Sequence, residues 1–169
     1  MNIISGFLPI ESSDARILIL GSMPSAASLD SNQYYAHPRN SFWYIIESLF
    51  ARESDLPYQH RKELLIKNRI ALWDVVQSCQ RRGSLDSAIE QGSIVINRFD
   101  EFYDRHPMIE MVFFNGSKAK TEYKKRVLPV LPENYARLAS RQLPSTSPAM
   151  ATLHRQEKLK QWKILTKYI

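Results

Sequence analysis

Short, almost wholly apolar runs recur along the chain. They occupy residues 15–21, 70–76 and 108–114, and a less regular run covers residues 136–143. Runs of this length that stay apolar at successive positions, rather than at alternate ones, are typical of parallel strands covered on both faces. The pattern therefore predicts four strands in a short, buried and mainly parallel sheet.

Between these runs the apolar positions follow a helical period. In residues 41–52 they fall on one side of a helix, and Asn40 and Ser41 at its start are good N-cap residue types. The same period predicts helices over residues 58–67, 117–130 and 156–168. Strands that alternate with helices indicate an α/β fold, here a three-layer α/β/α sandwich around the four-stranded sheet. Neither a Gly/Ser linker nor an internal repeat divides residues 1–169, so we expect a single domain.

Polar and conformationally unusual residues follow three of the predicted strands. Residues 21–25 (GSMPS) follow the first strand, residues 115–118 (NGSK) the third, and residues 144–148 (PSTSP) the fourth. A long polar stretch after the first loop ends in residues 35–40 (YAHPRN). Ligands of open parallel sheets bind where loops leave the carboxyl ends of the strands. We therefore expect these loops to converge on one cleft.

Charge and cysteine content narrow the classes of function. The net charge of +6 and the pI of about 9.5 favour a polyanionic partner, although a solvated basic surface is the alternative. Cys79 is the only cysteine, which excludes an intramolecular disulfide and a metal cage of several thiolates, and four scattered histidines show no ligand spacing. We expect no metal and no cofactor. The single cysteine suits a reducing cytoplasm, and no stretch approaches the about 20 apolar residues of a membrane span. We therefore expect a cytoplasmic protein without membrane association, and we also expect a monomer.

Six motifs taken together resemble the uracil-DNA glycosylase superfamily, and most strongly its hypoxanthine-DNA (deoxyinosine) glycosylase branch. They lie, in chain order, at residues 21–25, 35–43, 72–75, 82–86, 114–119 and 144–148, so the resemblance covers most of the chain. It implies an enzyme that flips a damaged nucleotide out of DNA and hydrolyses its N-glycosidic bond. The implied partner is DNA that contains deaminated bases.

The chain departs from the better-known branches at its catalytic positions. Mismatch-specific enzymes place a catalytic Asn where this chain has Ser22, and the Asp-Pro-Tyr-His motif of the classical uracil enzymes is absent. In the hypoxanthine branch, the Asn matching Asn40 is the one implicated in catalysis. Asn40 is therefore the main catalytic candidate, with Ser22 as the second. A neutral amide could orient the water that attacks C1′, while a helix cap is the alternative role of Asn40.

Residues of the same loops are candidates for binding the base. The resemblance matches Tyr35 to the aromatic that stacks on the flipped base, although Tyr34 and Tyr35 could instead both pack the loop. Asn115 could present its amide to the base edge or could only form a turn with the following glycine. Gly21 and Met23 belong to the loop that would shape the base site.

His37 is a further candidate for contact with the base or a phosphate, the alternative being a turn residue before Pro38. Asp74, at the end of the second strand, could polarise water or cap a turn.

Hydroxyl and cationic side chains near the predicted cleft are candidates for holding the DNA backbone. They are Ser25, Arg82, Lys118, Ser145, Thr146 and Ser147, with Arg81 as a further exposed charge. The alternative for the late loop is a polar surface loop, and Ala149 and Met150 beyond it could wedge into the space that the base leaves.

Two other functions remain open from the sequence. One is a uracil or G:U/T mismatch DNA glycosylase, because one pocket can accept several deaminated bases. The other is a noncatalytic nucleic-acid-binding α/β domain, which Ser22 at the usual Asn position would suit. No lysine is placed to act as a Schiff-base nucleophile, so the predicted enzyme is monofunctional and leaves an intact abasic site.

Overall fold

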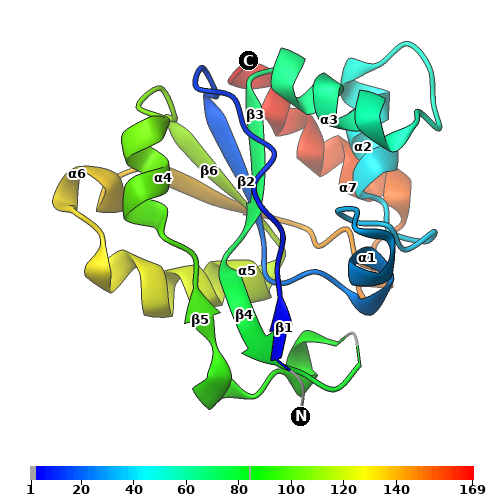
Figure 1. Ribbon diagram of the computed structural model, residues 1–169. Coiled ribbons are helices and arrows are strands. Elements are labelled where there is room, and N and C mark those ends of the chain that lie inside the picture. The colour runs from blue at the N-terminus through cyan, green and yellow to red at the C-terminus, as the bar shows by residue number, and fades with distance from the viewer. Residues whose placement is uncertain (1–2, 84) are drawn as a thin grey trace.

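A four-stranded parallel sheet forms the centre of the protein. The computed structural model describes residues 3–83 and 85–169. The strands of the sheet are β2 (Ile17–Gly21), β3 (Ile70–Asp74), β6 (Met111–Asn115) and β7 (Ala139–Leu143). They are hydrogen-bonded in the order β3-β2-β6-β7, and every pair is parallel (Figure 1). This confirms the predicted sheet.

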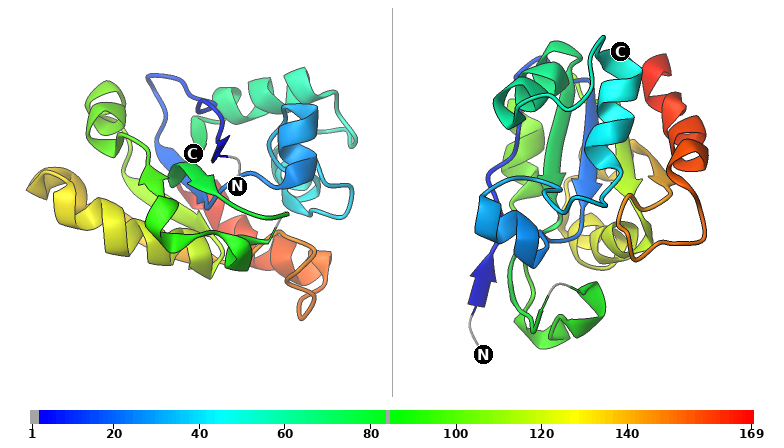
Figure 2. Two further views of the ribbon diagram at one scale, coloured as in Figure 1. Left: turned by 60° about the horizontal axis from the view of Figure 1, so that its bottom comes forward. Right: turned by 90° about the vertical axis from the view of Figure 1, so that its right-hand side faces the viewer.

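Helices cover both faces of this sheet, which completes the predicted three-layer sandwich. One face carries α2 (Phe42–Phe50), α3 (Tyr58–Lys67) and α7 (Arg155–Trp162), and the other carries α4 (Phe99–Arg105) and α5 (Ser117–Glu122). Figure 2 shows α2 and α7 in front of the sheet in its right-hand view. Successive side chains of a strand point to opposite faces. Ile19 therefore enters the core under α2 and α7, while Leu18 and Leu20 enter the core under α4.

A second, smaller sheet was not predicted. It consists of β1 (Ile3–Ser5), β4 (Val76–Gln80) and β5 (Val95–Ile96), which pair antiparallel in the order β1-β4-β5 at the lower end of the main sheet in Figure 1. The run over 70–76 is thus not one strand, because the chain leaves the main sheet after Asp74. Met23, Val76, Cys79 and Ile89 form a separate small core beside this sheet.

The helical segments differ from the predictions mainly at their ends. The segment predicted as one helix over 117–130 begins as α5, continues as a π-helical turn (Tyr123–Val127) and ends as a 3-10 turn (Leu128–Val130) that contains Pro129. The last helix changes from α7 to a 3-10 turn (Lys163–Lys167). Short helical elements that the sequence did not indicate are α1 (Ala26–Ser31), α4, α6 (Glu133–Ala136) and 3-10 turns at Asp86–Ala88 and Gln91–Ser93. None of the helices in the described ranges is both long and apolar enough to cross a bilayer.

Candidate active site

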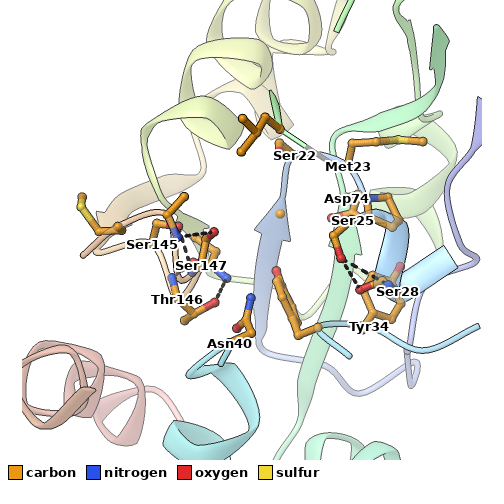
Figure 3. A pocket seen from close by; sticks show the side chains of 17 residues that line it. Ser22, Met23, Ser25, Ser28, Tyr34, Asn40, Asp74, Ser145, Thr146 and Ser147 are labelled. Atoms are coloured by element: carbon orange, nitrogen blue, oxygen red, sulfur yellow. Dashed lines mark hydrogen bonds between the residues drawn. The ribbon is translucent and has the colours of Figure 1, made fainter. Parts of the chain in front are cut away.

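A pocket of about 330 Å³ lies at the carboxyl ends of the parallel strands, as predicted (Figure 3). Its walls come from the loops after β2, β6 and β7 and from the start of α2. Small-molecule sites commonly have volumes of about 300–1,000 Å³, so the pocket can hold a single flipped base. The predicted site residues that line it are Gly21, Ser22, Met23, Ser25, Tyr35, Asn40, Asn115, Ser145, Thr146 and Ser147.

The absence of a side chain at Gly21 leaves space at the floor of the pocket. A Cβ built there would lie 2.3 Å from Oδ1 of Asp74 and 2.8 Å from the hydroxyl oxygen of Tyr35. Both distances are shorter than van der Waals contact allows. Asp74 is only 3% exposed and faces Gly21 in the neighbouring strand. Gly21 therefore allows a carboxylate and a phenol to approach each other over the end of β2.

The structure distinguishes the two adjacent tyrosines. Tyr34 is buried and donates its hydroxyl hydrogen to the carbonyl of Leu8, and burial raises its pKa well above the usual value. Tyr35 is half-buried and lines the pocket, and its ring stacks on Phe42 with centroids 4.2 Å apart. Tyr34 lines part of the pocket too, but Tyr35 offers the more accessible ring. Of the two tyrosines, Tyr35 is therefore the better placed for stacking on a base.

Tyr35 has an unusual backbone conformation. Its φ of 54° lies in the left-handed region, which costs a non-glycine residue on the order of 1–3 kcal/mol and must be enforced by the surroundings. The residues on either side are held in place: the indole N–H of Trp43 donates to the carbonyl of Tyr34 at 2.7 Å, and the amide of Ala36 donates to Oγ of Ser28 at 3.2 Å. These bonds hold the backbone on either side of Tyr35, and the stacking on Phe42 positions its ring.

Asn40 caps a helix and also lines the pocket. Its Oδ1 accepts a hydrogen bond from the backbone N–H of Phe42 at 3.0 Å, so Asn40 caps the start of α2, whereas the side chain of Ser41 makes no capping bond. Its side chain also enters the pocket (Figure 3). An amide has two N–H donors and a second oxygen lone pair beyond the one used for capping. The cap therefore orients the amide and leaves it able to bind a ligand.

Asn115 is held by Thr146 through two hydrogen bonds. Its Nδ2 donates to Oγ1 of Thr146 and its Oδ1 accepts from the backbone N–H of Thr146, both at 2.9 Å. The carbonyl of Thr146 in turn accepts from the N–H of Ser41 at 3.0 Å. The loops after β6 and β7 and the start of α2 are thus joined, which brings Asn40 and Asn115 to the same pocket. One N–H of the Asn115 amide remains to donate to a ligand.

The structure changes the role expected of Thr146. Its side chain is completely buried and its hydroxyl is bonded to Asn115, so the expected phosphate contact is wrong. Ser145 and Ser147 are half-buried, and their hydroxyl oxygens accept bonds from the N–H groups of Ser147 and Ala149, respectively. Accepting these bonds leaves each O–H as a donor. Ser145 and Ser147 are thus still able to contact DNA.

Ser25 lines the pocket and caps α1. Its Oγ accepts from the N–H of Ser28 at 3.2 Å and lies 3.1 Å from Oγ of Ser28, as drawn in Figure 3. A phosphate contact by Ser25 would compete with these bonds and stays a prediction.

Three predicted site residues lie outside the pocket. His37 lines a neighbouring groove instead, Lys118 forms a salt bridge of 2.8 Å with Glu122, and Arg82 is exposed to solvent. Ser84, in the motif at 82–86, lies outside the described residues. Arg81 was expected to be exposed, but it is buried, donating from Nη2 to the carbonyl of Pro24 and from Nε to that of Gly83. It therefore supports the loop after β2.

Two residues of α7 that support the late loop were missed. Lys158 is 3% exposed, and its Nζ donates to the carbonyls of Ser147 and Met150 at 3.3 and 3.0 Å. Desolvation lowers the pKa of Lys158. The indole N–H of Trp162 donates to the carbonyl of Pro144 at 3.0 Å. The available signal was a lysine four residues before Trp162, because this spacing places both on one side of a helix.

This geometry defines an α/β protein whose strand-end pocket presents an aromatic ring and two oriented amides. Comparisons with known proteins assign the chain to a family. The family model described as the uracil DNA glycosylase superfamily matches residues 9–167. The chain belongs to this superfamily.

Similar proteins are known from two archaea. The chain is 39% identical over 115 residues to a protein of Methanosarcina barkeri named hypoxanthine DNA glycosylase, covering 68% of this chain and 72% of that protein. A Methanosarcina acetivorans protein of the same name is 38% identical with the same coverage. A solution NMR structure from M. acetivorans, provisionally described as a uracil DNA glycosylase, has a TM-score of 0.77 and 31% identity, covering 98% of this chain and 99% of that one.

Proposed function

We propose that this protein is a monofunctional DNA glycosylase that releases hypoxanthine from deoxyinosine in DNA. The observation that carries the proposal is the convergence of Tyr35 and Asn40, from the segment between α1 and α2, and Asn115, from the end of β6, on one pocket of a size that suits a base. Membership of the superfamily and the similarity to proteins named hypoxanthine DNA glycosylase support the same reaction class and the same base.

The pocket would hold the base by stacking and by hydrogen bonding. The Tyr35 ring, backed by Phe42, offers an aromatic surface, and stacking on such a surface contributes about 1–3 kcal/mol per base. This energy offsets part of the few kcal/mol that unstacking and unpairing a nucleotide require. Asn115 faces the same space with an N–H that suits a purine acceptor such as O6 or N7.

The chemistry requires a water at C1′ and stabilisation of the departing base. Hydrolysis forms a bond from the oxygen of water to C1′ and breaks the bond to the base. The nitrogen of the base leaves with the electron pair and takes up the proton that the water releases. Asn40, whose Oδ1 accepts from the N–H of Phe42, would orient that water, and an N–H donor from Asn115 would stabilise the negative charge on the base. Ser22 lines the pocket as a second polar candidate.

The lysines near the site support a reaction without a covalent enzyme intermediate. Lys118 is paired with Glu122, and Lys158 donates to two backbone carbonyls. Within the described parts of the chain, no lysine lines the pocket. A hydrolytic enzyme of this kind leaves an abasic site and forms no adduct that borohydride can trap.

We further propose that it acts as a monomer in the cytoplasm, which gel filtration and localisation of the tagged protein would test.

The proposal is tested with a panel of oligonucleotides of one sequence that carry hypoxanthine, uracil, xanthine or ethenocytosine. Excess enzyme is mixed with each, and abasic sites are revealed by alkaline cleavage. We expect the fastest release from the hypoxanthine substrate. Much faster release of uracil would make the protein a uracil glycosylase instead, and DNA binding without any abasic product would make it a noncatalytic binding domain.

A further inference from the structure

A groove of about 900 Å³ adjoins the pocket on the side of α2 and α7. Its walls are the turn at residues 36–41 and the segment at 148–155 that leads into α7. Tyr35, Asn40 and Met150 line both the groove and the pocket. The groove is therefore continuous with the site at which a flipped base would lie, and a strand that leaves the pocket can enter it.

Each wall of the groove carries a histidine beside an arginine. In one wall Nδ1 of His37 accepts a hydrogen bond from the N–H of Arg39 at 3.1 Å. In the other, the side chain of His154 accepts from the backbone N–H of Glu157 and so caps α7, with Arg155 next to it. A ring nitrogen that accepts a hydrogen bond carries no proton, so the second ring nitrogen of each neutral histidine is an N–H donor. Both walls thus pair a neutral donor with a guanidinium.

Cations exceed anions in the groove. The groove has two carboxylates, Glu47 and Asp55. Glu47 is 4% exposed and accepts from Nε of Arg61 at 2.6 Å and from the backbone N–H groups of residues 55 and 56. The Asp55 side chain is therefore the exposed carboxylate. Arg39, Arg155 and Lys158 lie outside the salt bridges found among the described residues.

The Arg155 guanidinium lies over the Tyr44 ring at 4.4 Å. A guanidinium has five N–H donors, so this contact leaves donors available for an anion.

We propose that this groove binds the phosphodiester backbone of the strand that carries the flipped nucleotide. An adjacent phosphate would lie between the pair formed by His37 and Arg39 and the pair formed by His154 and Arg155. Phosphate oxygens only accept hydrogen bonds, and neutral N–H donors beside guanidinium groups are suited to them. The inference rests on the proposed function, because it takes DNA as the ligand of the pocket. Of the base and phosphate contacts that the sequence offered for His37, it selects the phosphate contact.

Substitutions can separate this role from a purely structural one. Asn at position 37 can still accept from the N–H of residue 39, and Asn at position 154 is a good helix cap. His37→Asn and His154→Asn therefore retain the local bonds and remove the ring N–H donors. Arg39→Ala and Arg155→Ala remove the charges. Arg137→Ala is the matched control, because Arg137 is exposed and lies outside both the pocket and the groove.

The experiment measures binding of fluorescein-labelled duplexes by anisotropy at several KCl concentrations. The duplexes carry either 2′-fluorodeoxyinosine, which resists hydrolysis, or adenine at the test position. We expect Arg39→Ala with Arg155→Ala to weaken binding about 10-fold and to lower the slope of log K against log [KCl] by about 0.9 for each phosphate that the variant no longer neutralises. The two histidine variants should weaken binding less than the double arginine variant does. Each variant should weaken binding equally for the two duplexes, because a side chain that binds the backbone does not read the base.

The proposal is overturned if the double arginine variant binds like Arg137→Ala, or if its loss of affinity is confined to the inosine duplex. Failure of the groove proposal is distinguishable from failure of the proposed function. Wild-type protein that releases hypoxanthine but is insensitive to the groove substitutions refutes the groove alone. Wild-type protein that releases no base, while the arginine variants lose affinity and salt dependence, refutes the glycosylase activity and supports the groove.

Discussion

Asn115 and Thr146 form a reciprocal pair: the amide of Asn115 donates to the Thr146 hydroxyl and accepts from the Thr146 backbone, both at 2.9 Å. The pair joins the loops after two neighbouring strands. Because the Thr146 side chain is completely buried, its hydroxyl acts on the site by orienting Asn115.

Thr146→Val tests this orientation. Valine has nearly the same shape and keeps the backbone bond, but it lacks the hydroxyl that accepts from Nδ2. We expect the free energy of unfolding to fall by about 1–3 kcal/mol and the single-turnover rate of base release to fall roughly 10-fold, measured by urea denaturation and quenched reactions. Thr146→Ser restores an acceptor and should recover most of the rate. Wild-type rate in the valine variant would show that the orientation of Asn115 is unimportant.

Asn40 can be examined with two substitutions, only one of which keeps a side-chain oxygen that can cap α2. Asn40→Ala removes both the cap of α2 and the amide, so base release should fall roughly 10²-fold or more, and stability should fall by about 1 kcal/mol. Asn40→Ser keeps a capping oxygen and should recover the stability, but not the rate. Single-turnover assays and thermal melts measure the two effects. Equal recovery of rate and stability by serine would mean that Asn40 only caps the helix.

Gly21→Ala should narrow the pocket. The new Cβ would meet Asp74 and Tyr35 at 2.3 and 2.8 Å, and relieving such overlaps typically costs about 1–3 kcal/mol. We expect lower stability and slower base release. The control is Gly92→Ala, because a Cβ at Gly92 meets no atom within 4 Å. If both variants behave alike, the close approach over Gly21 does not matter to the site.

Lys158 should make stability depend on pH. Burial lowers its pKa from the ordinary 10.5, so the unfolded chain binds this proton more tightly than the folded protein. The free energy of unfolding should therefore rise as pH increases from the lowered pKa towards 10.5, as the charged form is lost. The Lys158→Met variant has no ionisable side chain at this position and so lacks this contribution to the pH dependence. Urea unfolding between pH 7 and 10 should show wild type gaining stability relative to this variant, and parallel pH profiles would contradict the prediction.

The apolar runs were enough to predict the main sheet, because a strand buried on both faces has a distinctive composition. Ile17–Gly21 and Met111–Asn115 are examples. The small sheet was not predictable in the same way. Asp74 and Val76 are two residues apart in one apolar run, yet they belong to different sheets. The division depends on tertiary hydrogen bonds, such as the one from the Asn97 side chain to the carbonyl of Asp74.

The pocket lining was largely predictable from motifs, but the supporting contacts were not. Motif positions indicated Tyr35, Asn40 and Asn115, and all three line the pocket. Arg81 and Lys158 are charged residues that the sequence alone would place in solvent. Both are buried because backbone carbonyls, which have no sequence signature, accept their hydrogen bonds.

The small core beside the second sheet contains a cysteine whose chemical labelling can measure local opening of the protein. Cys79, the only thiol, is fully buried there against the cluster that includes Met23, and Met23 lines the pocket. A thiol-specific reagent can modify Cys79 only when this cluster opens. The rate of labelling in native protein therefore measures how often the wall behind the pocket loosens, and a slower rate with bound DNA would show that the ligand holds this wall closed.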